Sequence, residues 1–235
     1  MGSIDRLGRR ITRYVRPLSE PRCERLSAVV QRLDNVTVFL DRDGTLNHDS
    51  GYIACPEEFE LYPGAAAALA RLNLAGARLI LVTNQSGIGR GKLTVADLDD
   101  IHEKLRHQLE LQGARLDGIY FCPHHPDDAC VCRKPAVGMA ERAIADLKVV
   151  TSSMYLIGDQ SCDIEMAKRL KARSIFVTTG RDSAKTLQHL NAIGLRPQHV
   201  APCLASAVDW IFHDAKSVHD GQSVTSSASL QDREQ

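Results

Sequence analysis

The stretch Val36-Thr37-Val38-Phe39-Leu40-Asp41-Arg42-Asp43-Gly44-Thr45-Leu46-Asn47 joins a short apolar run to two acids and a glycine. Its first five residues are mostly apolar, with β-branched and aromatic types, and they predict a buried strand. Because side chains alternate along a strand, Asp41 and Asp43 would share a face and point at one spot beyond its carboxyl end. The same residues are also typical of a strand that ends in a solvated turn with no catalytic role. The choice between a site and a turn therefore depends on the rest of the chain.

Strands and helices are predicted to alternate after this stretch. Right-handed crossovers in such a pattern put the carboxyl ends of all strands at one edge of the sheet, where open α/β sheets bind ligands. Asp41, Thr83 and Asp159 each lie at the end of a predicted strand, so we expect them to converge there. The alternation indicates an α/β fold with a doubly wound, Rossmann-like parallel sheet. The further strands are predicted over 78–83, 118–121, 154–158 and 174–177, and the helices over 65–74, 94–112, 138–148 and 163–171.

The composition of the chain limits its partners. The 235 residues include 29 acids and 29 bases, and nothing in that balance indicates a nucleic-acid or membrane partner. No apolar run reaches the length of a membrane span, and the N-terminus lacks an apolar signal core. We expect a cytoplasmic monomer. The seven cysteines are an odd number and three of them lie in one short loop, which favours metal binding over a disulfide framework.

The domain boundaries also follow from composition. Residues 1–34 are rich in arginine and are expected to form an N-terminal extension with one helix over Glu24–Leu33. A single main domain is expected over 35–212. Residues 46–62 form a flap over the site that is too small to be a separate cap domain. The polar, serine-rich residues 213–235 are expected to be a disordered tail.

The predicted convergence of acids suits a magnesium ion. Mg²⁺ takes oxygen ligands and usually binds a substrate phosphate as well, and Asp41, Asp43 and Asp159 could supply those oxygens. A phosphate dianion beside carboxylates needs a further cation, and Lys134 is the natural candidate. Thr83 could donate its hydroxyl to a phosphoryl oxygen. Taken singly, Thr83 is more typical of a turn or a helix cap, and the pair Arg133 and Lys134 is more typical of a solvated surface.

Cysteine and histidine residues crowd into the loop over residues 122–132. The sequence Cys122-Pro123-His124-His125-Pro126 is followed by Cys130-Val131-Cys132, a spacing typical of a closed, structural Cys₃His zinc site. Four protein ligands leave no open position, so this Zn²⁺ would fold the loop and present Arg133 and Lys134. The histidine ligand can be His124 or His125, and we take His124. The expected ligands are Cys122, His124, Cys130 and Cys132.

Four segments together resemble the motifs of the haloacid-dehalogenase-like phosphatases. These are, in order, Asp41-Arg42-Asp43-Gly44-Thr45, Thr83-Asn84-Gln85-Ser86, Lys134, and Gly158-Asp159, and the resemblance covers residues 36–180. It implies that Asp41 attacks the phosphorus and forms an aspartyl-phosphate, while Asp43 acts as general acid and then as general base.

The resemblance also implies how the ion and the phosphate are held. Mg²⁺ would be bound by the Asp41 carboxylate, the Asp43 backbone carbonyl and Asp159. Thr83 and Lys134 would hold the transferred group. Asp163 could support the metal or act only as a helix cap.

The zinc motif narrows the resemblance to a branch with heptose bisphosphate phosphatases and histidinol-phosphate phosphatases. The segments Thr83–Lys92, Asp117–Tyr120, Cys122–Pro126 and His48–Tyr52 look like the heptose enzymes. The implied reaction is removal of the 7-phosphate from D-glycero-D-manno-heptose 1,7-bisphosphate, a step toward lipopolysaccharide. Arg133, with Arg90 or Lys92, could bind the second phosphate. The other expected substrate contacts are Asp49, Ser50, Gly51, Tyr52, Asn84, Gln85 and Ser86.

Two alternatives remain at this point. Histidinol phosphate is the alternative substrate, and a non-catalytic module that binds sugar phosphates is the alternative of another class. The glycine-rich segment 87–92 does not match the spacing of a nucleotide-binding P-loop. Gln160 departs from the family pattern, since a lysine is common at its position, and the zinc loop is short.

Overall fold

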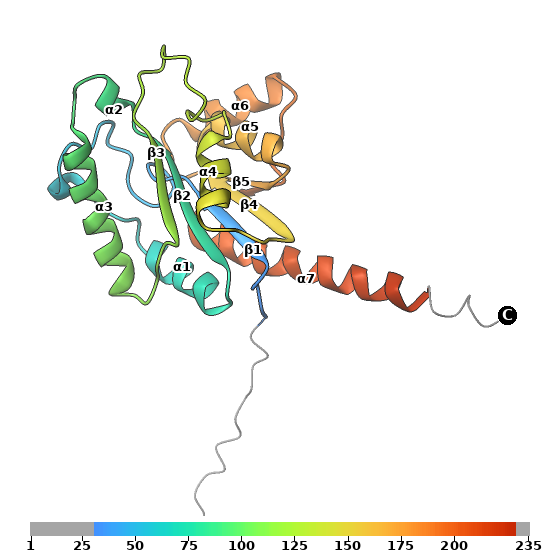
Figure 1. Ribbon diagram of the computed structural model, residues 1–235. Coiled ribbons are helices and arrows are strands. Elements are labelled where there is room, and N and C mark those ends of the chain that lie inside the picture. The colour runs from blue at the N-terminus through green and yellow to red at the C-terminus, as the bar shows by residue number, and fades with distance from the viewer. Residues whose placement is uncertain (1–30, 229–235) are drawn as a thin grey trace, which may run out of the picture. The chain divides into compact units, whose positions relative to one another are not determined.

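The computed structural model describes residues 31–228 of the chain (Figure 1). The predicted N-terminal helix over Glu24–Leu33 therefore lies largely outside the described residues. Its last three positions, 31–33, have no regular secondary structure.

Six parallel strands form one sheet in the order β3-β2-β1-β4-β5-β6. The predicted doubly wound parallel sheet is thus confirmed. Each predicted strand is present with its ends shifted by at most one residue, and β6 is an additional edge strand that its three residues were too few to predict. The strands are β1 (Val36–Leu40), β2 (Arg78–Asn84), β3 (Gly118–Cys122), β4 (Ser153–Gly158), β5 (Arg173–Val177) and β6 (His199–Ala201).

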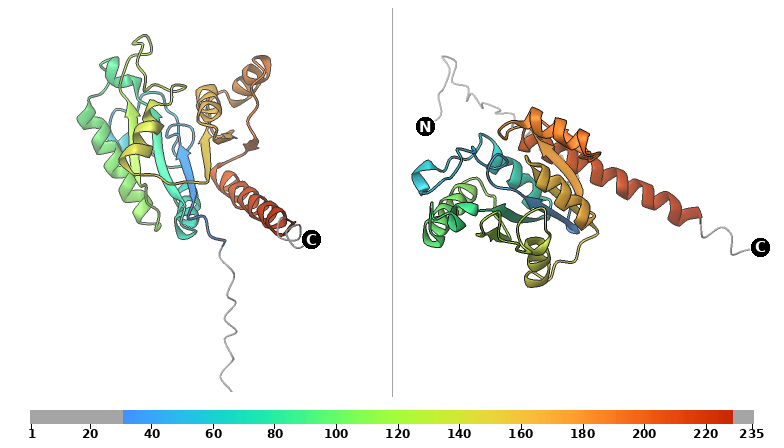
Figure 2. Two further views of the ribbon diagram at one scale, coloured as in Figure 1. Left: turned by 45° about the vertical axis from the view of Figure 1, so that its right-hand side comes forward. Right: turned by 90° about the horizontal axis from the view of Figure 1, so that it is seen from above.

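Both faces of the sheet are buried, as the continuous apolar runs of parallel strands require. In β1, Val38 and Leu40 belong to one hydrophobic core, whereas Phe39 between them belongs to the core on the other face. Helices α1, α3 and α7 pack on the first face, and α4 and α5 on the second, with α6 beside α5 (Figure 2). The helices are α1 (Ala65–Leu74), α2 (Ser86–Gly89), α3 (Val95–Glu110), α4 (Gly138–Asp146), α5 (Ser161–Leu170), α6 (Ser183–Ala192) and α7 (Leu204–Ala228), with a 3-10 turn η1 (Pro56–Glu58).

Helix α7 corrects the predicted C-terminal tail. Residues 213–235 were expected to be disordered, but α7 continues through Ala228, and residues 229–235 lie outside the described part of the chain. The helix passes residue 212 because its next turn is still part of the core. Ala215 is buried, and the Asp214 carboxylate accepts a hydrogen bond from the Tyr155 hydroxyl at 2.7 Å and pairs with Arg173.

The flap over residues 46–62 is short and well anchored. Its side chains Leu46, Ile53 and Phe59 are buried in the core, and Asn47 forms an isolated bridge with Leu61. The expected minimal flap without a separate cap domain is therefore present.

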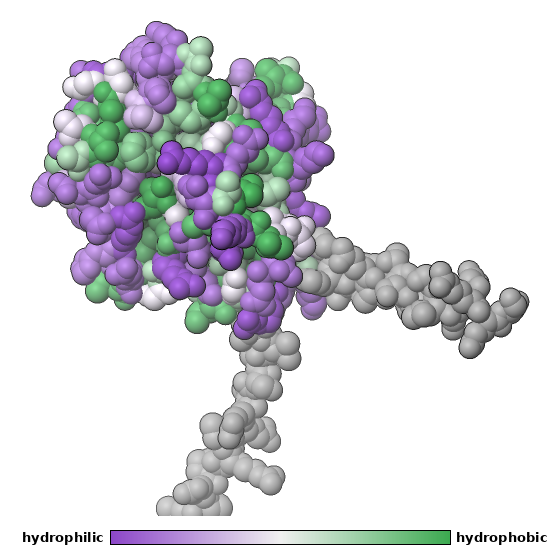
Figure 3. Space-filling model, viewed as in Figure 1, coloured by the Kyte–Doolittle hydropathy of each residue, from purple (hydrophilic) through white to green (hydrophobic). Residues whose placement is uncertain are grey.

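The surface mixes hydrophilic and hydrophobic residues on the face drawn in Figure 3. Exposed apolar side chains such as Val131, Val150 and Leu74 come from separate segments, which is ordinary for folded proteins. Within residues 31–228, every helix is too short or too polar to cross a lipid bilayer. The cytoplasmic location and the monomeric state stay predictions from the sequence.

Candidate active site

The carboxyl ends of the central strands surround a cavity of about 410 Å³. Asp41 follows β1, Thr83 and Asn84 end β2, and Asp159 follows β4. Every predicted catalytic and substrate-binding residue lines this cavity except Ser50, which is exposed on the flap. Asp159 lies beside the cavity and not in its wall. The topology therefore brings together residues that are far apart in the sequence.

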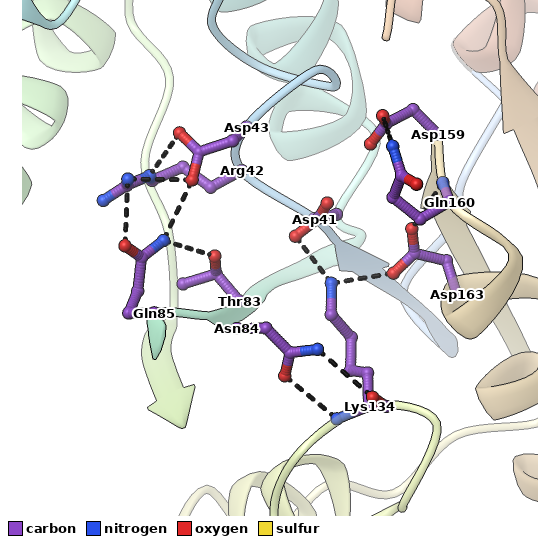
Figure 4. A network of polar contacts seen from close by, with 10 residues as sticks. All are labelled: Asp41, Arg42, Asp43, Thr83, Asn84, Gln85, Lys134, Asp159, Gln160 and Asp163. Atoms are coloured by element: carbon purple, nitrogen blue, oxygen red, sulfur yellow. Dashed lines mark hydrogen bonds and ion pairs between the residues drawn. The ribbon is translucent and has the colours of Figure 1, made fainter. Parts of the chain in front are cut away.

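Three buried carboxylates, Asp41, Asp159 and Asp163, form what we call the carboxylate cluster, with one oxygen of each within 4.8 Å of the others. The buried ammonium of Lys134 lies 2.6 Å from Asp41 Oδ1 and 2.7 Å from Asp163 Oδ1 (Figure 4). Asp163 also caps α5, since its Oδ2 accepts a hydrogen bond from the backbone N–H of Gln160 at 3.0 Å. Both sequence interpretations of Asp163, as a cap and as a member of the metal site, are therefore compatible with its position.

The electrostatics of the cluster call for a further cation. Burial raises the pKa of Asp41 to about 6, against the opposing charge of Lys134. Burial and the neighbouring charges of Asp41 and Asp163 raise the pKa of Asp159 to about 9. Burial works against the charge of Lys134, yet Asp163 and Asp41 hold the pKa of Lys134 above its ordinary value. When all three carboxyl groups are ionised, they leave a formal charge of −2 against the one ammonium, and a bound divalent cation would neutralise that charge and favour the ionised forms.

The donor set of the cluster fits Mg²⁺. The Oδ1 atom of Asp159 is buried and has no hydrogen-bond partner among the described residues, so it is available as a ligand. The Asp159 carboxylate also lies between Gly44 and Gly180, where a Cβ on either glycine would clash with it. Gly44 has a φ of +81° as well, so two separate constraints exclude a side chain there.

The Asp43 carboxylate lies in the wall of the same cavity as Asp41 and is held there by neighbouring side chains. It accepts hydrogen bonds from Arg42 Nε at 3.0 Å, Arg42 Nη2 at 2.8 Å and Asn47 Nδ2 at 2.9 Å, and Figure 4 shows it turned away from Lys134. Because β1 ends at Leu40, strand alternation does not set the direction of Asp43, yet Asp41 and Asp43 both line the same cavity at the end of this strand. Burial works against the charge of Asp43, but Arg42 and the hydrogen bonds hold its pKa below the usual value.

Two residues expected to contact substrate have their polar atoms engaged within the site. Gln85 donates from Nε2 to Thr83 Oγ1 at 2.8 Å and to Asp43 Oδ2 at 2.9 Å, and its Oε1 accepts from Arg42. Asn84 accepts from the Lys134 backbone N–H at 2.9 Å and donates to the Lys134 carbonyl at 3.2 Å. Both side chains line the cavity, and their contacts position Asp43, Thr83 and Lys134.

Arg133 is a second cation in the wall of the cavity. Its side chain is half-buried, lines the cavity, and has a buried Nη1 without a hydrogen-bond partner among the described residues. Arg90 and Lys92, which the sequence offered as less certain partners, do not line this cavity.

The predicted zinc ligands Cys122, His124, Cys130 and Cys132 form a second group, here called the Cys/His cluster. Cys130 Sγ lies 3.6 Å from Cys122 Sγ and from Cys132 Sγ, and His124 Nδ1 lies 3.2 Å from Cys132 Sγ. A tetrahedron with Zn–S bonds of about 2.3 Å has edges of roughly 3.8 Å, so the four ligand atoms fit a closed zinc site. His125 lies outside the cluster, because its Nδ1 accepts a hydrogen bond from the Asp127 backbone.

Arg42 is a residue of the site that sequence reasoning missed. Only 1% of it is exposed, and its guanidinium joins the Asp43 carboxylate to Gln85. An arginine between two acids gives no sequence signal of such burial. The carboxylate that compensates its charge belongs to the next residue, Asp43, whereas the amide of Gln85 follows β2 and is brought to Arg42 by the fold.

Comparisons with known proteins place this geometry in a family. A HAD-hydrolase-like family model matches residues 131–207. D-glycero-D-manno-heptose-1,7-bisphosphate 7-phosphatase from Chlorobaculum tepidum is 38% identical over 184 residues, which cover 73% of this chain and 91% of the relative. D-glycero-beta-D-manno-heptose-1,7-bisphosphate 7-phosphatase from Haemophilus ducreyi is 41% identical over 152 residues, covering 61% of this chain and 84% of that protein.

A solved structure agrees with these relatives. The crystal structure of D,D-heptose 1,7-bisphosphate phosphatase from B. bronchiseptica, complexed with magnesium and phosphate, has a TM-score of 0.69 and 35% sequence identity. The match covers 76% of this chain and 98% of that chain. With most of several relatives covered at more than 30% identity, this chain belongs to the haloacid-dehalogenase-like phosphatases and is a phosphoric monoester hydrolase.

Proposed function

We propose that this protein is a magnesium-dependent phosphatase that removes the 7-phosphate from D-glycero-D-manno-heptose 1,7-bisphosphate through an aspartyl-phosphate on Asp41. The observation that carries the chemistry is the buried carboxylate cluster with Lys134 at its centre. The choice of substrate is supported by the relatives, which are named heptose-bisphosphate phosphatases.

Asp41 is the proposed nucleophile. It lines the cavity, and its Oδ1 is held at 2.6 Å by Lys134, which fixes the carboxylate and keeps it ionised. One oxygen would attack the phosphorus in line with the leaving alkoxide. Lys134 and the Thr83 hydroxyl, both in the cavity wall, would hold the phosphoryl oxygens as negative charge moves onto them.

The Asp41 and Asp159 carboxylates and the Asp43 backbone carbonyl would hold Mg²⁺. The ion would offset the charge of the carboxylate cluster and polarise the phosphoryl group. Gly44 and Gly180 leave space for Asp159 to take its place beside Asp41.

Asp43 is the proposed general acid and base. Its ionised form, held by Arg42, suits the second half of the reaction, in which a carboxylate takes a proton from the water that hydrolyses the aspartyl-phosphate. Acting first as an acid requires Asp43 to exchange its contact with Arg42 for one with the leaving oxygen. Gln85 and Asn47, which bind the same carboxylate, define the position to which it returns.

Arg133 and the flap would bind the remainder of the substrate. A second phosphate is a dianion, and the guanidinium group of Arg133 in the cavity wall could pair with it. Asp49, Gly51 and Tyr52 line the cavity from the flap and could contact the sugar. The Cys/His cluster would hold Zn²⁺ and so fix the loop that carries Arg133 and Lys134.

Phosphate release from a substrate panel tests this proposal. The panel contains both anomers of heptose 1,7-bisphosphate, histidinol phosphate and fructose 1,6-bisphosphate, each with and without Mg²⁺. We expect a heptose bisphosphate to have the highest kcat/KM, phosphorus NMR to show loss of the 7-phosphate, and activity to disappear without Mg²⁺. A preference for histidinol phosphate would overturn the substrate, and no turnover of any phosphate ester would leave only a binding module.

A further inference from the structure

The loop that follows β5, residues 178–181, connects the flap to the catalytic turn. The Thr179 hydroxyl donates a hydrogen bond to the Gly44 carbonyl at 2.6 Å. The Tyr62 hydroxyl, at the end of the flap, donates to the Thr179 carbonyl at 2.8 Å. The same loop therefore fixes the turn after Asp41 and one end of the flap.

Gly180 fixes this loop against the carboxylate cluster. A Cβ at Gly180 would clash with the Asp159 carboxyl group, so the backbone of the loop lies directly against that side chain. The side chain of the next residue, Arg181, therefore starts from a fixed position beside the carboxylate cluster.

Arg181 reaches from this loop to the tip of the flap. Its Nε donates to the Asp49 carbonyl at 2.5 Å and lies 3.5 Å from Asp49 Oδ2. Its Nη atoms lie 3.8 and 3.9 Å from the position of a Cβ on Gly51. Asp49, Gly51 and Tyr52 line the cavity, whereas Arg181 does not, so any effect of Arg181 on the substrate passes through the flap.

We propose that Arg181 is a positioning residue that holds flap residues 49–52 against the cavity and thereby governs binding of the part of the substrate remote from the transferred phosphate. The inference rests on the proposed function for its substrate. The hydrogen bond to a carbonyl is charge-assisted, but the side chain is 54% exposed, so its contribution is moderate. We expect Arg181→Ala to raise KM for the bisphosphate about three- to tenfold and to change kcat by less than about twofold.

The experiment compares Arg181→Ala, Arg181→Lys and the matched control Lys185→Ala. Lys185 is a nearby exposed cation that pairs with Asp182 and makes no flap contact in the described structure. Hydrogen exchange of a peptide spanning residues 48–54 reports on the flap without any substrate. KM and kcat are measured with heptose 1,7-bisphosphate and with acetyl phosphate, whose small leaving group cannot reach the flap.

The expected result is faster exchange in residues 48–54 for Arg181→Ala, partial recovery in Arg181→Lys, and wild-type exchange in Lys185→Ala. KM should rise for the bisphosphate alone. Unchanged flap exchange in Arg181→Ala, or an equal rise in KM for both substrates, would overturn the role of Arg181. If the wild-type enzyme does not turn over heptose bisphosphate, the proposed substrate fails, and the exchange data alone then support or overturn the contact with the flap.

Discussion

The carboxylate cluster and the Cys/His cluster are built in opposite ways. The ligands of the Cys/His cluster all come from residues 122–132, so their spacing can be read directly from the sequence. The carboxylate cluster takes Asp41 from the end of β1 and, more than one hundred residues later, Asp159 from the end of β4 and Asp163 from α5. The Cys/His cluster can form within a short segment of chain, whereas the carboxylate cluster forms only when the parallel sheet has folded.

The two clusters also differ in how they manage charge. The carboxylate cluster buries three acids and depends on Lys134 for its one positive side chain. Lys134 comes two residues after Cys132, and Asn84 holds its backbone from β2. The loop of the Cys/His cluster therefore positions Lys134, the cation that the carboxylate cluster requires. Substitutions in the two clusters test that dependence, beginning with the largest expected effect.

Removing the nucleophile should abolish turnover while the fold and the Cys/His cluster stay intact. Asp41→Asn keeps the shape of the side chain and removes the charge that attacks phosphorus, so kcat should fall roughly 10⁴-fold or more. Phosphate release in the presence of Mg²⁺ measures the effect. Asp99→Asn, the same substitution at an exposed acid of α3 outside the cavity wall, is the control and should retain wild-type activity. Substantial activity in Asp41→Asn would mean that another group attacks the phosphorus.

Removing the shared cation should damage both activity and stability. Lys134→Met leaves buried carboxylates without their ammonium partner, which should cost about 3–5 kcal/mol of unfolding free energy in urea without metal. Added Mg²⁺ should recover part of that loss, because it restores positive charge to the cluster. The control, Arg133→Met, changes a half-buried neighbour outside the ion pairs, and its stability should differ from wild type by less than about 1 kcal/mol. Equal losses in the two variants would show that burial of charge at Lys134 is unimportant.

Disrupting the Cys/His cluster should also disturb the carboxylate cluster, because Lys134 directly follows the Cys/His loop. Cys130→Ser should lower bound zinc from about one ion per chain to a small fraction of that, and activity should fall about 10- to 100-fold. Elemental analysis and phosphate release report the two effects. Cys203→Ser, which changes a cysteine outside the cluster, serves as the comparison. Full activity in a zinc-free Cys130→Ser protein would show that the carboxylate cluster works independently of the Cys/His cluster.

The smallest predicted effect concerns the stability of the protein and a buried histidine. His102 is buried on α3, and its Nε2 lacks a hydrogen-bond partner within the described residues. Burial, followed by the charges of Arg42 and Arg106, lowers the pKa of His102 to about 3. Below pH of about 6.5 the unfolded chain gains a proton that the folded protein does not, so stability falls as the pH decreases.

This pH dependence can be measured with His102→Leu. Between pH 7 and pH 5 the wild-type protein should lose about 2 kcal/mol through this group, and the variant should lose less. His107→Leu, a change of an exposed histidine on the same helix, should leave the pH dependence unchanged. Urea titrations at the two pH values give the free energy of unfolding of each protein. An equal change in that free energy for wild type and His102→Leu would contradict the proposed effect of His102.

Much of the fold could be predicted because it depends on local patterns. Apolar runs marked β1, β2, β4 and β5, and the capping box of Thr94 and Asp97 marks the start of α3. The same reasoning missed α6 and β6, since β6 has only three residues and gains its stability by pairing with β5. It also ended the domain too early, because Asp214 joins the core only through side chains of β4 and β5.

The candidate site could be predicted as a set of residues but not as a set of contacts. Strand ends on one edge were enough to bring Asp41, Thr83 and Asp159 together. The orientation of Asp43 depends on Arg42 and Gln85, whose side chains meet only after the sheet has formed. Arg181 acts across 132 positions of sequence, and no spacing rule connects it to Asp49.

The link between Tyr155 and Asp214 limits how far the protein can be shortened. A truncation that ends at residue 212 would remove the acceptor of a buried phenol and the partner of Arg173, and it would uncover the apolar surface beneath Ala215. A trimmed version intended for crystallisation or expression should therefore keep at least the turn of α7 that contains these residues.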